Sequence, residues 1–385
     1  MFSLSGFLQV RKSDRSLLYR FYAIYLVSGL LNTMLGVLMP YLGEEYGLAY
    51  SVRGLLLSSV QVGNVTAMFL AGVLPYVIGR KKNTVLFASL MVLGYLLMLL
   101  VGHPAILFVA FLFTGLGRGT LVNISNVVVG ETAGNKGGGL NLLHACFALG
   151  AFIAPLLLIA TVSKGWRLAP ALALSLMVIG VLLIAFSTLS SKPSRREKGK
   201  GFVPRTLDFY LDMGILFTYV AAEAGLVGWL VTYFRDSGLL PEAFSASMQS
   251  LLWVMILAGR LSCAFLSPRM SKNLLLLLCG ILMTLSFLLM ILPSQVPLIV
   301  LGVLGLGLFM GGIYPTTIAT VPERYSSDTT VMGLLLGSAT IGAILMPSVI
   351  GKLAEAIGIA GGIASLLAVC LLMIVLMTVK TVTKS

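Results

Sequence analysis

The sequence predicts an all-α integral membrane protein, in which twelve transmembrane helices form two six-helix bundles related by pseudo-two-fold symmetry. Its composition, the number of its apolar segments and an internal repeat lead to this prediction. Of the 385 residues, 58% are hydrophobic and 10% are charged, whereas charged residues make up about a quarter of a typical soluble domain. Most of the chain is therefore expected to lie in lipid.

Twelve apolar segments have the length of about 20 residues that is needed to cross a bilayer. Six precede a basic stretch near the middle, at 20–42, 53–78, 84–102, 105–129, 138–161 and 168–190. Six follow it, at 209–234, 243–267, 273–292, 297–321, 330–351 and 358–379. The basic stretch carries Lys192, Arg195, Arg196, Lys198, Lys200 and Arg205. The predicted domains are an N-terminal bundle at 1–190, a linker at 191–208 and a C-terminal bundle at 209–385.

The chain has a formal net charge of +13, and its Lys and Arg side chains fall mostly in alternate turns between the predicted spans. One set of turns carries Arg11, Lys12, Arg15, Arg20, Arg80, Lys81, Lys82, Lys136, the linker, Arg269, Lys272, Arg324, Lys380 and Lys384, and the other carries only Arg53, Lys164, Arg167, Arg235 and Lys352. Because basic residues concentrate on the cytoplasmic side, we expect a multi-pass protein of the cell membrane with both termini and the linker cytoplasmic. The charges form no single patch, which disfavours a nucleic-acid partner.

A pattern of small residues occurs once in each half of the chain. The matched pairs are Gly115-Leu116-Gly117 with Gly305-Leu306-Gly307, Gly150-Ala151 with Gly342-Ala343, and Pro155 with Pro347. They occur in the same order and at nearly the same offset. Such a repeat predicts two similar bundles that rock about a shared central site.

The stretch GVLPYVIGRKK, from Gly72 to Lys82, lies between the second and third spans. It resembles the G-x-L-a-D-r-x-G-r-k signature of the major facilitator superfamily in both glycines, the leucine and the basic tail. Tyr76 stands where that family usually has Asp, so the charge-relay role of the Asp does not carry over. The resemblance implies the twelve-helix fold, alternating access and a gating role for Gly72, Gly79 and Arg80.

Shorter matches are similar to the fucose and glucose/galactose permease branch of this family. They are Asn141-Leu142-Leu143-His144 followed by Phe147, Gly150 and Pro155, then Glu223 ahead of Gly228-Trp229, and Tyr314-Pro315. This resemblance implies a sugar substrate. The acidic residues that the branch can carry in its first and fourth spans are absent, because those spans offer Asn32 and Arg118 instead.

Glu223 lies near the middle of the seventh span, within TYVAAEAGLVGWL. An ionisable side chain at the bilayer centre costs about 3 kcal/mol unless it is paired or hydrated, which makes it a candidate functional residue. Burial and a nearby cation change the proton affinity of a carboxylate in opposite directions, as proton coupling requires. The structural alternative is a neutral, hydrogen-bonded Glu or a fixed ion pair.

Arg118 lies inside the glycine run of the fourth span and suits either an anionic substrate group or pairing with Glu223. The alternative is an internal structural pair. Amides and indoles suit the hydroxyls and the ring face of a sugar, although amides also join membrane helices by hydrogen bonds. The predicted substrate-binding residues are Arg118, Asn32, Gln61, Asn123, Asn126, Asn141, Trp229 and Trp253. We expect His144 and Arg260 at a cytoplasmic gate, with helix packing as the alternative for His144.

Nothing in the sequence indicates a cofactor, a metal site or catalysis. The four cysteines all lie inside spans without metal-ligand spacing, and no G-x-x-x-x-G-K-[ST] run indicates ATP. We therefore expect a monomeric secondary transporter, not an enzyme, which moves a small polar solute, preferably a sugar, with protons or another cation. The alternative is proton-coupled export of drugs or amphipathic, lipid-like compounds. Rivals of other classes are a channel, which would give currents far above transporter turnover, and an intramembrane enzyme, which would need a convergent catalytic set that the sequence does not show.

Overall fold

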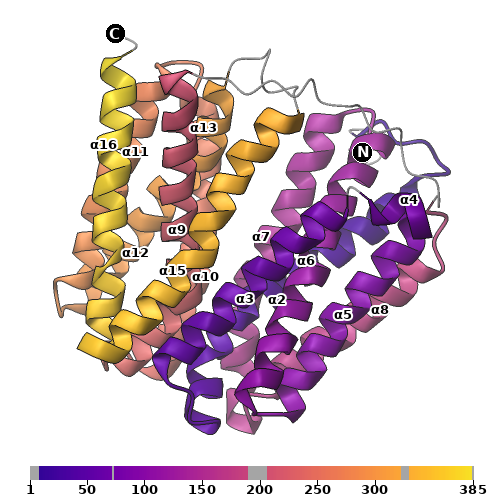
Figure 1. Ribbon diagram of the computed structural model, residues 1–385, viewed down its shortest axis with the longest axis horizontal. Helices are drawn as coiled ribbons and strands as arrows, with labels where there is room; N and C mark the ends of the chain where they lie inside the picture. The colour runs from indigo at the N-terminus through magenta and orange to yellow at the C-terminus, as the bar shows by residue number, and fades with distance from the viewer. Residues whose placement is uncertain (1–7, 72, 190–205, 322–328, 384–385) are drawn as a thin grey trace. The chain divides into compact units, whose positions relative to one another are not determined.

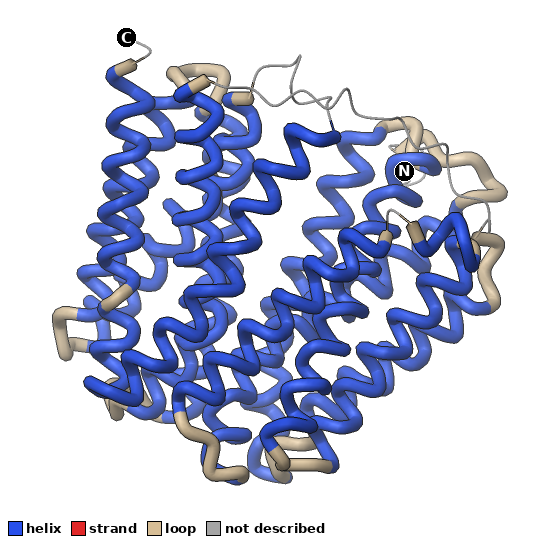
Figure 2. Tube along the Cα trace, in the orientation of Figure 1, coloured by secondary structure: helices blue, strands red, loops and turns tan. Residues whose placement is uncertain are grey.

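The computed structural model describes residues 8–71, 73–189, 206–321 and 329–383 and confirms the predicted all-helical membrane fold (Figure 1). Within these ranges the chain forms helices joined by turns, without a strand (Figure 2). Of the predicted linker at 191–208, only residues 206–208 are described. The helices are α2 Arg15–Glu45, α3 Tyr50–Leu70, α4 Leu74–Ile78, α5 Arg80–Leu100, α6 Pro104–Thr132, α7 Lys136–Thr161, α8 Leu168–Ala185, α9 Leu207–Asp236, α10 Glu242–Leu266, α11 Lys272–Ile291, α12 Val296–Gly311, α13 Ile313–Thr320, α15 Thr329–Ala364 and α16 Leu366–Val382.

Ten helical segments in the described part of the chain are long and apolar enough to cross a membrane. Two differences separate this number from the predicted twelve. Helix α3 is not among the ten, since polar residues such as Gln61 and Asn64 interrupt its apolar surface. Val331–Val382 counts as one segment, although Ile357 and Gly358 leave the helical conformation within it, close to the predicted turn.

The chain divides into two compact units, the first formed by Met1–Tyr46 and Ser59–Arg195 and the second by Gly47–Ser58 and Arg196–Ser385. In the first unit, α2 packs along α7, α5 along α6, and α8 against α2 and α5 (Figure 1). In the second unit, α9 packs along α15, α11 along α12, and α16 against α9 and α11. Each unit therefore pairs its first long helix with its fifth and its third with its fourth.

Helices α3 and α6 of the first unit cross at a point where each helix has a glycine. A Cβ added at Gly63 would collide with the carbonyl of Leu112, and one added at Gly115 with the carbonyl of Val60. Small residues at such a crossing allow two helix backbones to approach closely in a membrane. The second unit repeats this crossing between α10 and α12. The equivalent pairs there are Gly259 against Leu308 and Gly311 against Ile256.

This crossing corrects the register of the predicted repeat around the fourth and tenth spans. The sequence pattern pairs Gly115 with Gly305, but Gly305 faces Ser286 of α11, the third helix of its unit. Helix packing instead pairs Gly115 with Gly311, because both abut the second helix of their unit. The glycine pattern alone does not tell which neighbour each glycine faces.

The predicted match between the fifth and eleventh spans agrees with the packing. Gly150 of α7 lies against the backbone of Leu26 in α2, and Gly342 of α15 lies against the backbone of Phe217 in α9. In both units the glycine of the fifth long helix thus brings that helix onto the first. Leu26 and Phe217 are consequently equivalent positions.

Candidate functional site

Four side chains from three helical segments of the second unit form a polar group, here called the Glu223 cluster: Tyr219, Glu223, Arg260 and Tyr314. Glu223 is half-buried in α9, and Tyr219 lies one turn earlier on the same face of that helix. The rings of Tyr219 and Tyr314 lie 6.2 Å apart between centroids. Glu223 and Arg260 both lie in the neighbourhood of these two tyrosine hydroxyls.

The fold brings this cluster together through the glycine crossing. Arg260 directly follows Gly259 on α10, so its backbone lies close to α12. The predicted tenth span divides at Gly312 into α12 and α13, and Tyr314 lies in the first turn after this division. The predicted proton-coupling residue, Glu223, therefore shares its surroundings with Arg260, which the sequence placed only at a gate.

The first unit contains a second polar group at its own glycine crossing. Arg118 Nη1 of α6 donates a hydrogen bond to Gln61 Oε1 of α3 at 3.4 Å. The side-chain oxygen of Asn64 lies beside Gly119, next to Arg118 in the sequence. The structure thus brings together two predicted substrate-binding residues, Arg118 and Gln61. A pairing of Arg118 with Glu223 stays a prediction, because the two residues belong to different units.

These polar groups occupy equivalent positions in the two units. Equivalent residues lie at the same sequence distance from the helix contacts described above. One lies three residues after Gly115 or Gly311, a second lies one residue after Gly63 or Gly259, and a third lies six residues after Leu26 or Phe217. The equivalent pairs are Arg118 with Tyr314, Asn64 with Arg260, and Asn32 with Glu223. The repeat therefore extends from packing residues to candidate site residues.

The other predicted amides have varied surroundings. Asn126 Nδ2 donates to the carbonyl of Val122 in its own helix at 2.7 Å, which engages part of its hydrogen-bonding capacity. Asn123, Asn141 and His144 are exposed on their helices. The ring of His144 lies edge-on to that of Tyr25, with 5.9 Å between centroids, in keeping with the helix-packing alternative. Their proposed roles stay predictions.

Both predicted substrate-stacking indoles are buried in this structure. Trp229 has no exposed surface, and its Nε1 donates to the carbonyl of Pro347 at 3.1 Å. Trp253 is 6% exposed. Neither ring presents a face on which a sugar could stack in this conformation. A role for Trp229 or Trp253 in stacking would require movement of the surrounding helices, and it stays a prediction.

The predicted gating segment between α4 and α5 contains a bidentate ion pair. Arg80 is 7% exposed, and its Nη1 and Nη2 donate to the two carboxylate oxygens of Glu131 at 2.9 and 2.6 Å. Gly79 adopts φ 87° between the two helices, a conformation that glycine adopts without steric cost. Glu131 lies in the last turn of α6, and the antiparallel packing of α5 and α6 brings it to Arg80. Gly72 lies outside the described residues.

Sequence reasoning missed a buried ionic group in the second unit, formed by Asp212 of α9, Thr320 of α13 and Lys380 of α16. Lys380 Nζ forms an ion pair with Asp212 Oδ1 and donates to Thr320 Oγ1 at 2.7 Å. The hydroxyl of Thr320 also donates to Asp212 at 3.0 Å. Lys380 is 1% exposed and Asp212 3% exposed. Lys380 was predicted as a topology charge, and only Asp212, one of two acidic residues inside the predicted seventh span, could have indicated its partner.

Ion pairs also tie the loops at the opposite ends of the helices. In the first unit, Arg167 donates from Nη1 to Glu45 at 3.0 Å, and Trp166 Nε1 donates to the same carboxylate at 2.6 Å. The hydrogen bonding of Arg167 to Glu45 raises the pKa of Arg167 above its ordinary value, so this arginine remains charged at any physiological pH. In the second unit, which includes the start of α3, Arg53 Nη1 forms an ion pair with Asp236 at 3.4 Å, and Tyr50 OH donates to the same carboxylate at 2.9 Å.

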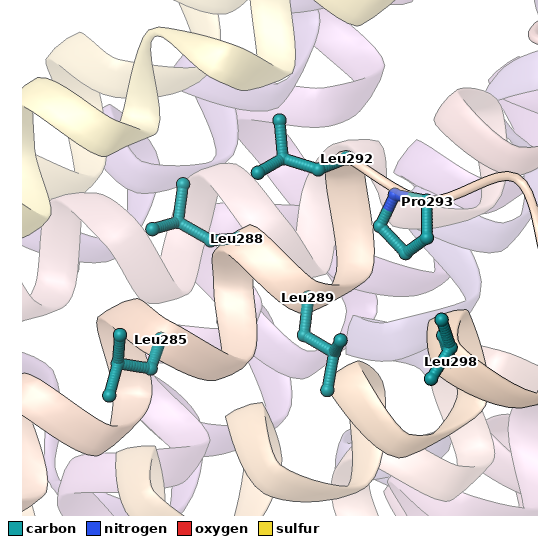
Figure 3. A pocket seen from close by; sticks show the side chains of 6 residues that line it. All are labelled: Leu285, Leu288, Leu289, Leu292, Pro293 and Leu298. Atoms are coloured by element: carbon teal, nitrogen blue, oxygen red, sulfur yellow. The ribbon is translucent and has the colours of Figure 1, made fainter.

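A hollow of about 410 Å³ lies at the turn between α11 and α12 (Figure 3). It is lined by Leu285, Leu288, Leu289, Leu292, Pro293 and Leu298. Figure 3 shows only leucine and proline side chains around it. Because this lining offers no polar side chain to a sugar or an ion, the hollow does not qualify as the solute site.

Comparisons with known proteins agree on the family. The profile of the Major Facilitator Superfamily matches residues 21–330. A Bacillus subtilis (strain 168) protein described as "Uncharacterized MFS-type transporter YfkL" is 25% identical over 357 residues, which cover 88% of this chain and 89% of the relative. A TsgA homolog of Yersinia enterocolitica is 21% identical over 369 residues, with 89% of each chain covered.

Solved structures show the same fold at low sequence identity. The nucleoside transporter NupG superposes with a TM-score of 0.78 at 14% identity, covering 95% of this chain and 99% of NupG. An inward-facing bacterial homolog of the human lysosomal transporter Spinster gives a TM-score of 0.74 at 14% identity, with 96% and 97% coverage. Since the family profile covers most of the chain, the protein belongs to the major facilitator superfamily and is a multi-pass membrane transporter, not an enzyme.

Proposed function

We propose that this protein moves a small polar solute, preferably a neutral sugar, by alternating access, and that Glu223 couples this movement to protons. The Glu223 cluster is the observation that carries the proposal. A carboxylate inside a membrane protein favours the protonated form when it is desolvated and the ionised form when a cation faces it. Arg260 supplies the cation, and a change in its distance from Glu223 during transport would therefore bind or release a proton.

The polar group of the first unit supplies candidate contacts for the solute. Arg118 and Gln61 present hydrogen-bond donors and an amide to the same region of α3 and α6. Asn32 occupies the position equivalent to Glu223 but carries no charge that varies with pH. Donors and acceptors without a titrating carboxylate suit the hydroxyls of a neutral sugar, so we assign solute recognition mainly to these residues.

The location follows from the distribution of charge along the sequence. We propose that the protein resides in the cell membrane as a monomer, with both termini and the linker in the cytoplasm. The excess of basic residues in one set of turns supports this orientation. Labelling of single cysteines introduced at Lys12 and at Lys164, in intact cells and after lysis, tests it. Only the variant at Lys164 should react in intact cells.

The experiment for the proposed function measures uptake into proteoliposomes under an imposed pH gradient. The panel contains labelled hexoses and one labelled nucleoside, the latter because NupG, a transporter of nucleosides, shares the fold. The parent is compared with Glu223→Gln and with Asp208→Asn, which neutralises a carboxylate in the first turn of the same helix. We expect one sugar to accumulate in the parent and in Asp208→Asn. Glu223→Gln should exchange that sugar across the membrane without concentrating it.

Other outcomes would change the proposal in defined ways. If Glu223→Gln still concentrates the sugar, another residue couples the proton. If the nucleoside alone moves, the solute class is wrong but the coupling test can be repeated with it. If no member of the panel moves, export of amphipathic compounds becomes the hypothesis to test, with dye efflux from inverted vesicles as the measurement.

A further inference from the structure

Two cysteines of the second unit lie within contact distance of each other, although they belong to two successive helices. Cys263 of α10 and Cys279 of α11 have their sulfur atoms 3.7 Å apart. Each residue is 6% exposed. Both are free thiols, as are Cys146 and Cys370. At 3.7 Å one thiol can donate a weak hydrogen bond to the other, and a disulfide would require the two sulfurs to approach to about 2.05 Å.

The pair lies beside the Glu223 cluster. Cys263 follows Arg260 by three residues, so it lies about one turn further along α10. A Cβ added at Gly312, where the tenth span divides, would overlap the sulfur of Cys263. The thiol of Cys263 therefore packs directly on the division between α12 and α13, two residues before Tyr314. Cys263 thus lies close in the chain or in space to two members of the cluster, Arg260 on the same helix and Tyr314 just after the division.

We propose that Cys263 and Cys279 are a redox-active thiol pair, which a hydroperoxide closes into a disulfide between α10 and α11. The sulfur of one thiol attacks the O–O bond of hydrogen peroxide, giving a sulfenic acid and releasing one water molecule. The second thiol then displaces the hydroxyl group as a second water, and the S–S bond forms. The two thiols lose two electrons and two protons in total, and the peroxide accepts both. A cellular thiol reverses the reaction by exchange.

A neighbouring thiol distinguishes this pair from an isolated buried cysteine. Buried single cysteines are usually inert, and a sulfenic acid without a partner oxidises further or persists. Here the second sulfur is in place before the first is oxidised, so the disulfide forms without a search by the chain. Disulfides on the cytoplasmic side are usually transient and serve redox sensing, which agrees with the predicted position of the α10–α11 turn.

Thiol counting tests the proposal without any transport assay. The purified protein in lipid nanodiscs is treated with hydrogen peroxide, quenched, unfolded and titrated for free thiols. The parent, with four cysteines, should retain two, and peptide mapping should find Cys263 linked to Cys279. Cys370→Ser, which removes a buried cysteine outside the pair, should fall from three thiols to one. Cys263→Ser and Cys279→Ser should show no loss of paired thiols.

Two results would overturn the proposal. The parent could retain all four thiols at peroxide concentrations that oxidise an exposed control cysteine, or Cys263→Ser could lose as many thiols as the parent. A trivalent arsenical, which bridges two adjacent thiols, gives an independent check on the folded protein. It should protect two thiols together from an alkylating reagent in the parent and none in either single variant.

The effect on transport rests on the proposed function and is measured separately. Because the disulfide would fix α10 to α11 one turn from Arg260, we expect peroxide to slow solute exchange at least fivefold, and dithiothreitol to restore it. Cys263→Ser should be insensitive to peroxide. If the disulfide forms and exchange is unchanged, the thiol pair exists but does not regulate transport. Failure of the untreated protein to move any sugar would count against the proposed function alone.

Discussion

The two units share a helix crossing but differ in the chemistry at equivalent positions. In the first unit these positions hold Asn32, Asn64 and Arg118, and in the second they hold Glu223, Arg260 and Tyr314. The glycines that allow the crossing are kept in both units. The polar side chains beside them have changed type, so that the only carboxylate of these six residues belongs to the second unit. Under the proposed function, the repeated scaffold divides solute recognition and ion coupling between its two copies.

The ion pairs at the helix ends on the predicted cytoplasmic side show a second difference. The pair in the first unit, Arg80 with Glu131, has side-chain exposures of 8% and 42%. The pair in the second unit, Lys380 with Asp212, has side-chain exposures of 1% and 4%. Solvent screens the first pair but not the second. The two units should therefore respond very differently to the loss of one partner.

The largest expected effect is that of Lys380→Met. This change leaves Asp212 buried without its cation, and breaking a buried pair in this way costs about 3–5 kcal/mol of unfolding free energy. Thermal unfolding in detergent measures it, with Lys352→Met, at an exposed lysine of α15, as the control. The double variant Asp212→Leu with Lys380→Met should recover most of the loss. If the single variant unfolds like the parent, the pair is not buried in the protein.

Substitution at the equivalent glycines should have the next largest effect. Gly115→Ala and Gly311→Ala each force a methyl group against a backbone carbonyl of the neighbouring helix, and such overpacking costs about 1–3 kcal/mol. Gly130→Ala, at a helical glycine of α6 with open space around it, is the matched control and should be neutral or slightly stabilising. Equal losses at 115 and 311 would support the corrected register. A loss at Gly305→Ala alone would contradict it.

Substitutions of the two arginines, Arg260 and Arg118, should cause different kinds of transport defect. Under the proposed function, Arg260→Gln should alter the pH profile of transport, because it removes the cation that shares the cluster with Glu223. Arg118→Gln should instead raise the KM for the solute and leave the pH profile in place. Transport rates across a pH series measure both. Identical pH shifts in the two variants would contradict the division between recognition and coupling.

The smallest effect is expected for Glu131→Gln. Its carboxylate is nearly half exposed, and a screened ion pair contributes about 1 kcal/mol or less. Thermal unfolding should therefore change by no more than a few degrees. Asp212→Asn provides the comparison and should cost clearly more. If the two variants lost equal stability, the contrast in burial between the two ion pairs would have no energetic consequence.

The sequence predicted the membrane helices well because length and apolar composition determine them. It also singled out Glu223 as a candidate, since a carboxylate in the middle of a long apolar run is easily recognised, and its coupling role stays a prediction. It failed for Lys380, because a lysine near the end of a span has the same local sequence whether it faces solvent or a buried aspartate. The register of the repeat failed for a related reason. Whether Gly115 corresponds to Gly305 or to Gly311 depends on the helix that each one touches, and that partner is distant in the sequence.

The polar character of α3 has a consequence for how the protein is made. This helix is not apolar enough to be counted among the membrane-crossing segments, and its glutamine and glycine meet their partners on α6. More than thirty residues separate the end of α3 from the start of α6, so those partners are synthesised later. We therefore expect α3 to remain at the translocon or at the lipid headgroups during translation, and to enter the bilayer stably only when α6 arrives to cover it.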